Sequence, residues 1–384
     1  MTGVLAGLRL AIIGILCVAA MVSVTQGYRN AMENSQDFQW SPTVILIRHG
    51  EDPYQEFKKK PEQSRLILSQ IPTYSHFTYL MLAPIAFLNF KTAKIVWAIL
   101  NLIFATTVFL LLQNRFDRKM LFILYLLFLC STPLRNSIGN GQQSLLCLFF
   151  YVSAISLTDH GYRALASGAA GFGSFKFSFG VPLVAAVAFD HWKYVFIYLI
   201  PTLVGVLFWI LFFHHGLVET LFLPLSVSQT AIGAADLLSV LRQSGFSQAV
   251  SMGLPLLFLC VVAVIQWLWF PIDDVLDRVA FYALVSLLLI YHSSYDQVFL
   301  LLCLVRTINS KSYVVQIVTW AVVGYFWYGL KVMSLIVGWD SWTHMDQGPL
   351  LWINHISLWV LFGTLIFDVR KAGLERLLAP QDCR

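Results

Sequence analysis

Residues 95–113 read IVWAILNLIFATTVFLLLQ, an apolar run about as long as the roughly 20 residues that one membrane-spanning helix needs. Similar runs recur along the whole chain. Of its 384 residues, 58% are hydrophobic and 12% are charged, and the mean hydropathy is +0.72. A soluble domain is about 45–50% apolar and about 25% charged, and a disordered chain needs low hydrophobicity. The composition excludes both classes and predicts an all-α, polytopic integral membrane protein.

Apolar runs separated by polar breaks predict a bundle of about 12 (10–13) transmembrane helices. The runs cover residues 5–27, 95–113, 120–134, 144–158, 164–175, 178–190, 194–213, 249–270, 279–291, 297–308, 314–337 and 350–368. Several of them are shorter than a full span. The fifth and sixth runs are alternatively one helix that is broken between Gly173 and Lys176.

Between the first two runs lies a long loop, residues 28–94, which we expect to carry short interfacial helices. One of them has Ser41 as its N-cap, Pro42 at its first position, residues 43–49 after it and Gly50 beyond its end. Its apolar side chains suit the membrane surface or the helix bundle. Residues 79–90 form a second apolar run, long enough for an interfacial or re-entrant helix. The whole chain is predicted to form one membrane domain.

Lysine and arginine are distributed unevenly over the breaks, which predicts the orientation in the membrane. With the N-terminus in the cytoplasm, thirteen of them lie in the tails and short cytoplasmic breaks, and three lie in the later outer breaks. That bias satisfies the positive-inside rule. Both termini, including the tail 369–384, are then cytoplasmic, and the chemically varied breaks are extracytoplasmic. The net charge of +5 is small for this length, so no nucleic-acid partner is expected.

Two charged residues are candidate functional groups because of where they lie. Asp37 follows the first helix by a few residues, and a carboxylate at the mouth of a bundle can take a proton from an incoming hydroxyl. The alternative is an ordinary solvated loop aspartate. Lys176 is the only charged residue between Arg163 and Asp190, and an ionisable group at membrane depth is costly. A lysine that reaches to the interface is the alternative.

The polar break at residues 135–143 carries candidate ligand-binding groups. Arg135, Asn140 and Gln142 supply a cation and amide donors beside two glycines that let a ligand approach the backbone. Such a set suits a phosphate or the hydroxyls of a sugar. A polar turn that links two helices explains the same residues equally well.

A second polar break, at residues 291–296, forms a tight turn between two apolar runs. His292 could orient or donate to an anionic oxygen, and Tyr295 lies beside it in the same break. Asp296 could fix either that histidine or Lys176. A polar hairpin turn without a ligand is again the alternative.

Residues 339–346 combine aromatic side chains with Asp340, His344 and Asp346. Tryptophans there could stack on a sugar, although tryptophan at a membrane boundary commonly belongs to the aromatic belt. The two carboxylates and the histidine are metal ligands by type, but a loop gives them no fixed spacing. We therefore expect no metal and no cofactor.

The order of these motifs resembles glycosyltransferase family 87. The resembling elements, over roughly residues 5–310, are Asp37-Phe38-x-Trp40, Gly50-Glu51-Asp52-Pro53-Tyr54, Tyr74 to Pro84, Pro133 with Gly141-Gln142, Gly171-x-Gly173-x-x-Lys176 and Tyr295-Asp296. The chain departs from the family pattern in two places. Thr73 stands where the family often has a second proline, and Gln143 stands where an asparagine usually follows the Gly-Gln pair.

The resemblance implies a GT-C membrane enzyme of the bacterial inner membrane, similar to mannosyltransferases that use polyprenyl-phosphate mannose. A hexose would pass from the lipid phosphate to an extracytoplasmic hydroxyl, on a glycolipid or glycan, with inversion. Asp37 would deprotonate the acceptor, while Lys176, Arg135 or His292 would stabilise the departing phosphate. Asn140, Gln142, Tyr295 and Asp296 would complete the donor site. An ordinary aspartate, with a pKa of about 3.9, would already be ionised.

Two other functions fit parts of the same pattern. A transporter or flippase of a lipid-linked or anionic substrate would use Lys176 midway along a water-filled path, but the chain shows no convincing internal repeat. A non-catalytic scaffold would use the polar breaks as connectors only. Alanine substitutions at Asp37, Gln142, Lys176 and His292 would then have no effect.

Overall fold

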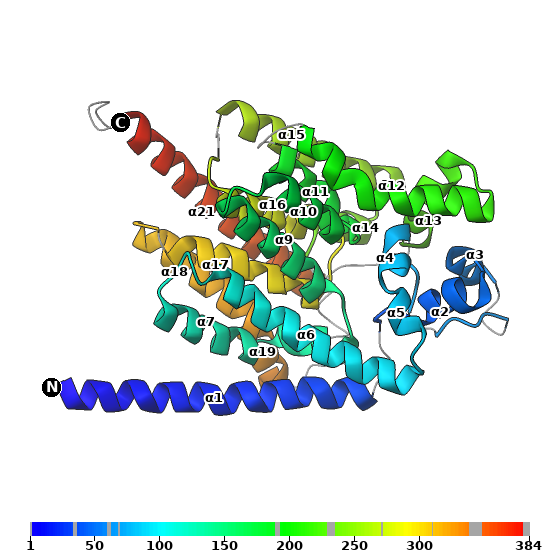
Figure 1. The fold of residues 1–384 in the computed structure, drawn as a ribbon. Helices are drawn as coiled ribbons and strands as arrows, with labels where there is room; N and C mark the ends of the chain where they lie inside the picture. The colour runs from blue at the N-terminus through cyan, green and yellow to red at the C-terminus, as the bar shows by residue number, and fades with distance from the viewer. Residues whose placement is uncertain are drawn as a thin grey trace. The chain divides into compact units, whose positions relative to one another are not determined.

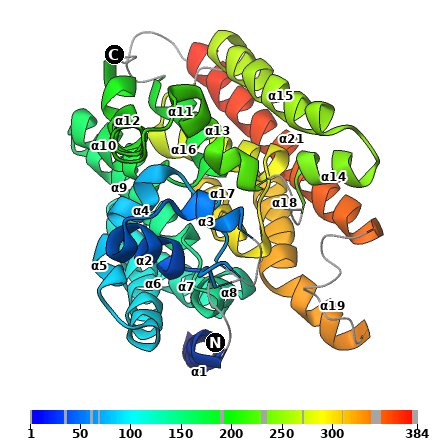
Figure 2. The ribbon, with the colours of Figure 1, turned by 90° about the vertical axis from the view of Figure 1, so that its right-hand side faces the viewer.

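The computed structural model describes residues 2–33, 37–59, 63–67, 70–188, 193–228, 235–269, 272–308, 310–337 and 348–378. Figures 1 and 2 show these residues from two directions. Every regular element in the described part of the chain is a helix, and no strand occurs there. The predicted all-α class is therefore confirmed.

The chain divides into two compact units. The first unit takes its described residues from 1–180 and 194–230, and the second takes its described residues from 181–193 and 231–384. The first unit contains α1 (Thr2–Glu33), α2 (Trp40–His49), α3 (Pro53–Phe57), α4 (His76–Met81), α5 (Ala83–Ala86), α6 (Phe90–Leu112), α7 (Arg118–Cys130), α8 (Thr132–Asn140), α9 (Ser144–Asp159), α10 (Arg163–Gly173), α12 (Lys193–Phe213) and α13 (Leu217–Ser228). The helix α11 (Phe177–Ala188) begins in the first unit and ends in the second.

The second unit is also helical throughout its described residues. It contains α14 (Leu237–Gln243), α15 (Gln248–Trp269), α16 (Val275–Leu289), the 3₁₀ helix η1 (Ser294–Phe299), α17 (Leu300–Ile308), α18 (Tyr313–Gly324), the π-helix η2 (Tyr325–Gly329), α19 (Leu330–Val337) and α21 (Gly348–Leu378). The elements from α18 through η2 to α19 follow one another without a break.

Six helical segments are long and apolar enough to cross a membrane. They are Gly7–Glu33, Phe90–Leu112, Lys193–Phe213, Gln248–Trp269, Tyr313–Met333 and Pro349–Val369, and a bent pair made of α7 and α8 raises the number to seven. The other predicted runs coincide with helices that are shorter. The described residues thus confirm an integral membrane protein, but the expected count of about 12 spans is not confirmed.

The helix α8 replaces the polar turn that was considered for residues 135–143. Ser131 caps it by accepting a hydrogen bond from the backbone N–H of Leu134 at 3.3 Å, and Pro133 lies in its first turn. Gly141 ends it in the left-handed conformation, with φ of 68°. These start and stop signals let a polar segment fold as a helix, which meets α7 at an angle of 56°. The interpretation as a simple turn is wrong.

The end of α1 packs tightly against α8 because both helices carry a glycine at the contact. A Cβ atom added at Gly27 would lie 3.2 Å from the backbone oxygen of Arg135, and one added at Gly139 would lie 3.0 Å from the Cβ of Asn30. Small residues allow such close approach between helices in membranes. The contact fixes α8 beside the point where the chain leaves α1 and enters the first loop.

The first loop is largely helical, but its helix boundaries differ from those predicted. The helix α2 begins at Trp40, one residue before the expected N-cap, and ends at His49 with Gly50 after it, as predicted. Ser41 lies in its first turn, where its Oγ accepts a hydrogen bond from the backbone N–H of Ile67. The apolar run 79–90 is divided between α4, α5 and the start of α6, because Pro84 starts α5 and cannot continue α4.

Candidate active site

Backbone contacts anchor Asp37 beside the end of α8. Its backbone N–H donates to the carbonyl oxygen of Asn140 at 2.7 Å. The next residue, Phe38, is fully buried, and its ring stacks on those of Phe90 and Trp97 at centroid distances of 5.8 and 6.4 Å. Trp97 in turn donates its indole N–H to the carbonyl of Gly141 at 2.7 Å. The position of Asp37 is therefore set by α6 and α8 together.

Two neutral amides hold the carboxylate of Asp37. The Nε2 of Gln39 donates to Oδ1 at 2.5 Å, and the Nε2 of Gln142 donates to Oδ2 at 2.9 Å. Each carboxylate oxygen can accept two hydrogen bonds, so an amide on each leaves capacity for another donor. The arrangement orients a carboxylate and still allows it to accept a proton from a hydroxyl.

Further residues hold the two amides in place. The hydroxyl of Tyr74 donates to the Oε1 of Gln142 at 3.1 Å, and the hydroxyl of Tyr79 donates to the Oε1 of Gln39 at 3.4 Å. Gln39 also donates to the carbonyl of Ile71 at 3.0 Å. Its backbone is left-handed, with φ of 61°, which is uncommon for a residue other than glycine. These contacts oppose rotation of the amides away from Asp37.

Burial raises the pKa of Asp37 from its ordinary value to about 7, because loss of water disfavours the charged carboxylate. The hydrogen bonds from Gln142 and Gln39 and the positive charge of Lys176 act in the opposite direction and limit the rise. The expectation of an ordinary pKa near 3.9 is therefore wrong. A base whose pKa is close to neutral pH suits proton transfer better than a strongly acidic carboxyl does.

Lys176 lies between α10 and α11, which are separate helices rather than one. Its side chain is buried, its Nζ donates to the Oγ of Ser144 at 3.1 Å, and the ammonium lies 6.0 Å from the ring centre of Phe179. The backbone N–H of Ser75 donates to the carbonyl of Phe175, which ties the first loop to this segment. Lys176 is near enough to Asp37 to lower its pKa, so these two predicted residues belong to one site.

The other two candidates on α8 make contacts that hold the local structure. Arg135 donates from Nη2 to the Oγ1 of Thr132, one turn earlier on the same helix, at 3.2 Å. Asn140 contributes its backbone carbonyl to Asp37. Gln142, by contrast, contacts the carboxylate of Asp37 directly. Binding of the donor by these three residues remains a prediction.

The candidates at 291–296 lie in the second unit. His292 is fully buried, and its Nδ1 lies 3.4 Å from the carbonyl of Ile290 and 3.9 Å from the Oδ2 of Asp236. Asp236 also caps α14, and it is the carboxylate that faces His292. Of the predicted tight turn, residues 294–296 belong to η1, which carries the half-buried Tyr295, and residues 291–293 precede it.

Asp296 has a different local role from the one expected. Its Oδ2 accepts a hydrogen bond from the backbone N–H of Ser293 at 3.1 Å, within a capping box at the start of η1. Such reciprocal hydrogen bonds fix the first turn of a helix. The carboxylate is therefore used to build η1. Its predicted part in donor binding stays a prediction.

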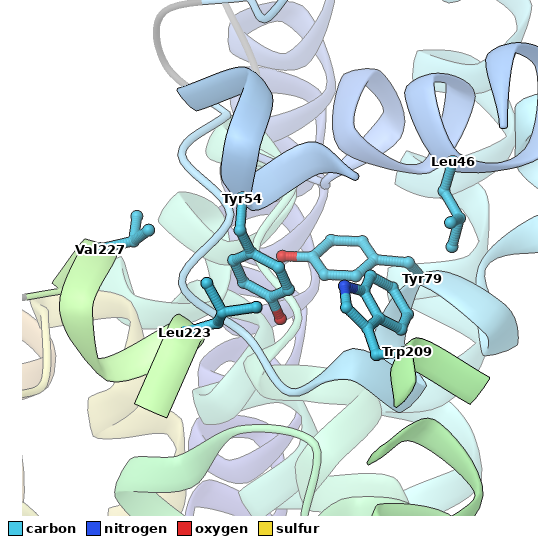
Figure 3. Packing of buried hydrophobic residues seen from close by; sticks show 6 residues of the cluster. All are labelled: Leu46, Tyr54, Tyr79, Trp209, Leu223 and Val227. Carbon is cyan, nitrogen blue, oxygen red and sulfur yellow. The ribbon is translucent and has the colours of Figure 1, made fainter. Parts of the chain in front are cut away.

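Sequence reasoning overlooked the roles of two residues of the first loop. Gln39 donates a hydrogen bond to the carboxylate of Asp37, and Tyr79 donates one to the amide of Gln39. Gln39 follows Asp37 by two residues within an otherwise aromatic segment, which was the available signal. Tyr79 also packs in a buried cluster with Leu46, Tyr54, Trp209, Leu223 and Val227, which Figure 3 shows gathered between the first loop, α12 and α13. Through its hydrogen bond to Gln39, Tyr79 joins this cluster to the site.

A second overlooked group stabilises the same cluster. Asp52 accepts hydrogen bonds from the backbone N–H of Tyr54 at 2.9 Å and from the indole of Trp209 at 3.2 Å. Its Oδ2 lies 2.9 Å from the Nε2 of His215. The carboxylate thereby links α3 to α12 and to the segment just before α13.

The metal-binding possibility at residues 339–346 lies outside the described residues, since 338–347 are not among them. Within the described ranges, no three His, Cys, Asp or Glu side chains gather closely enough to hold a metal ion. The chemistry of the site around Asp37 rests on a carboxylate, neutral amides and an ammonium group.

The described residues combine helices long enough to cross a membrane with a buried carboxylate that two amides hold near an ammonium group. The model of glycosyltransferase family 87 matches residues 73–293, which is more than half of the chain. The chain therefore belongs to glycosyltransferase family 87 and is a membrane glycosyltransferase. The matched range includes Tyr74, Gln142, Lys176 and His292, and Asp37 precedes it. No curated protein and no solved structure matches significantly.

Proposed function

We propose that the protein transfers a hexosyl group, mannose or a similar sugar, from a polyprenyl phosphate to a hydroxyl of a glycolipid or glycan. Asp37 is the general base of this reaction. The observation that carries the proposal is the carboxylate of Asp37, which Gln39 and Gln142 hold by one amide each and whose pKa is raised to about 7. Membership of family 87 supports glycosyl transfer as the reaction class.

The reaction is a single displacement. Ionised Asp37 removes the proton of the acceptor hydroxyl as the acceptor oxygen attacks the anomeric carbon. A new bond forms between that carbon and the acceptor oxygen, and the bond to the phosphate oxygen breaks. The electron pair leaves with the polyprenyl phosphate, while the proton stays on Asp37. Because a phosphate leaves without being protonated, one base is enough, and the anomeric configuration is inverted.

Lys176 supplies the positive charge for the leaving group. Its buried ammonium donates a hydrogen bond to Ser144, and its positive charge lowers the pKa of Asp37. An ammonium aimed at a developing phosphate charge stabilises the transition state most in a site with little water. Arg135, in the same unit, is a further candidate for this task. Neutral amides on Asp37, in place of a second cation, leave the carboxylate basic enough to accept a proton.

A lipid-linked donor explains why the enzyme needs a membrane fold. Polyprenyl chains dissolve in the bilayer, and the candidate spans of the first unit would deliver the phosphate to the level of the first loop. The excess of lysine and arginine in the tails and short loops supports cytoplasmic termini and an extracytoplasmic site. A bacterial inner membrane is the setting that fits such a donor.

A transfer assay with purified protein tests the proposal. Polyprenyl phosphates carrying radiolabelled mannose, glucose or galactose are supplied in turn, together with a membrane extract as the source of acceptors. We expect label to move from one of these donors into a larger glycolipid or glycan. Nucleotide sugars serve as the control donors and should give no direct transfer. Transfer from a nucleotide sugar alone would contradict the proposed donor class.

A further inference from the structure

Tyr54 is connected to Asp37 by a short series of hydrogen bonds. Its side chain is fully buried, and its hydroxyl donates to the backbone carbonyl of Tyr74 at 2.6 Å. The hydroxyl of Tyr74 donates to the Oε1 of Gln142, whose Nε2 donates to the carboxylate of Asp37. All four residues belong to the first unit. The position of Tyr54 therefore bears on the amide that holds one oxygen of the proposed base.

The ring of Tyr54 and its hydroxyl make different contacts. The ring packs edge-on against the rings of Tyr79 and Trp209, at a centroid distance of 5.8 Å in each case. Figure 3 shows the Tyr79 ring directed toward Tyr54. Burial raises the pKa of the Tyr54 hydroxyl well above its ordinary value, so it stays protonated and remains a donor. A variant that lacks only the hydroxyl would lose the bond to the Tyr74 carbonyl and keep the aromatic packing.

Asp52 holds the backbone of Tyr54. It is the N-cap of α3, and its Oδ1 accepts the hydrogen bond from the backbone N–H of Tyr54. The same oxygen accepts the indole N–H of Trp209, on α12. A hydrogen bond to a charged carboxylate is roughly twice as strong as one between neutral groups. Asp52 thus fixes Tyr54 to a long helix of the first unit.

Two histidines lie close to Asp52 and Tyr54. The Nε2 of His215 lies 2.9 Å from the Oδ2 of Asp52, and its Nδ1 lies 3.2 Å from the Oε1 of Glu219. His76 packs against the ring of Tyr54 at a centroid distance of 5.1 Å. Burial, together with the charge of His215, lowers the pKa of His76 to about 3, so His76 is neutral at pH 7. Asp52 is therefore paired with His215, while His76 contributes packing.

We propose that Tyr54 and Asp52 are positioning residues for the proton transfer at Asp37, an inference that rests on the proposed role of Asp37 as the base. The hydroxyl of Tyr54, which Asp52 holds in place, fixes the backbone of Tyr74. The hydroxyl of Tyr74 then keeps the amide of Gln142 turned toward Asp37. A hydrogen bond from that amide favours the ionised carboxylate, which is the form that accepts a proton.

Tyr54→Phe tests the inference, with kcat/KM measured from pH 5 to pH 9 on the full chain in detergent. The donor is the polyprenyl phosphate sugar that is active in the transfer assay. The midpoint should rise by about 0.5 pH unit, so that the rate at pH 5 falls about threefold relative to the rate at pH 9. In a Gln142→Leu background the same substitution should leave the midpoint unchanged, because the amide through which it acts is absent.

Tyr282→Phe is the matched control. Tyr282 is also fully buried, and its hydroxyl donates to the Oε1 of Gln266 at 3.0 Å within the second unit. Both phenylalanine variants should lower the Tm, because each loses a buried hydrogen bond, but only Tyr54→Phe should move the midpoint.

Asp52→Asn is a second variant of the proposed series. An amide oxygen accepts the hydrogen bond of the Tyr54 backbone more weakly than a carboxylate does, so the midpoint should move in the same direction by a smaller amount. That variant gives the decision should Tyr54→Phe not fold.

The outcomes separate the positioning role from the proposed function. If Gln142→Leu moves the midpoint and Tyr54→Phe does not, Tyr54 only stabilises the fold, and Asp37 remains the base. An equal shift by Tyr54→Phe in the Gln142→Leu background would also overturn the inference, because the effect would not pass through that amide. If the wild type transfers no sugar, or its midpoint lies near pH 4, the proposed function itself is wrong and the positioning role falls with it.

Discussion

Asp37→Asn is expected to lower kcat by on the order of 10³-fold while the protein keeps its fold. A general base contributes about 10² to 10⁴ in rate, and asparagine cannot accept the proton of the acceptor hydroxyl. The substitution preserves the size of the side chain, and the Oδ1 of asparagine can still accept a hydrogen bond from one of the two amides. Initial rates with the lipid-linked donor, together with Tm in detergent, measure the effect.

Glu51→Gln is the control for Asp37→Asn. Glu51 lies in the same loop, and its carboxylate pairs with Arg65 at 2.8 Å near the surface. Exposed ion pairs contribute little, so its loss should leave the rate close to that of the wild type. If Asp37→Asn retained more than a tenth of the wild-type rate, another group would have to be the base.

The transfer rate should rise roughly 100-fold between pH 5 and pH 8. Only ionised Asp37 can accept the proton, and a pKa of about 7 leaves about one carboxyl in a hundred ionised at pH 5. Activity is therefore lost as the pH falls through 7 and is complete above it. Profiles of kcat/KM against pH give the midpoint directly. A midpoint near 4 would show that Asp37 is an ordinary carboxyl or not the base.

Substitution of a neighbour should move the midpoint in a known direction. Gln142→Leu removes a hydrogen bond that favours the ionised carboxylate, so the profile should move to higher pH. The charged group that faces Asp37 is Lys176, and the hydroxyls of Tyr74 and Tyr79 act on the amides and not on the carboxylate. In Gln142→Leu, Lys176 and Tyr79 are not altered, and Tyr74 loses only its hydrogen bond to the removed amide, so the shift can be assigned to the loss of the Gln142 amide.

The sequence indicated which charged residues belong to the site, but not how the residues of the site contact one another. Asp37 and Lys176 could be recognised because a charge in an apolar setting is costly and must have a reason to be there. Gln39 could not be recognised in this way, because an uncharged glutamine in a loop has no comparable desolvation cost. It contacts Asp37 because its own backbone is left-handed and turns its side chain back toward the carboxylate. The raised pKa of Asp37 likewise arises from burial, which is a property of the fold.

The helical class was predictable from hydropathy, while the exact number of spans was not. Periodicity cannot distinguish a short buried helix from a full crossing, and α9 and α11 are apolar but short. The helix α8 was not predicted because its sequence is polar, although Ser131 and Pro133 are typical of a helix start and Gly141 of a helix end. The capping role of Asp296 depended on η1, which replaced the expected turn.

The anomeric configuration of the product tests the central claim most directly. One base, Asp37, and a departing lipid phosphate require a single displacement on the anomeric carbon. Product from the active donor can be collected and its anomeric proton coupling read by NMR. We predict a configuration opposite to that of the donor. A retained configuration would require either a covalent sugar intermediate or attack on the face from which the phosphate departs, and it would contradict the single displacement proposed for Asp37.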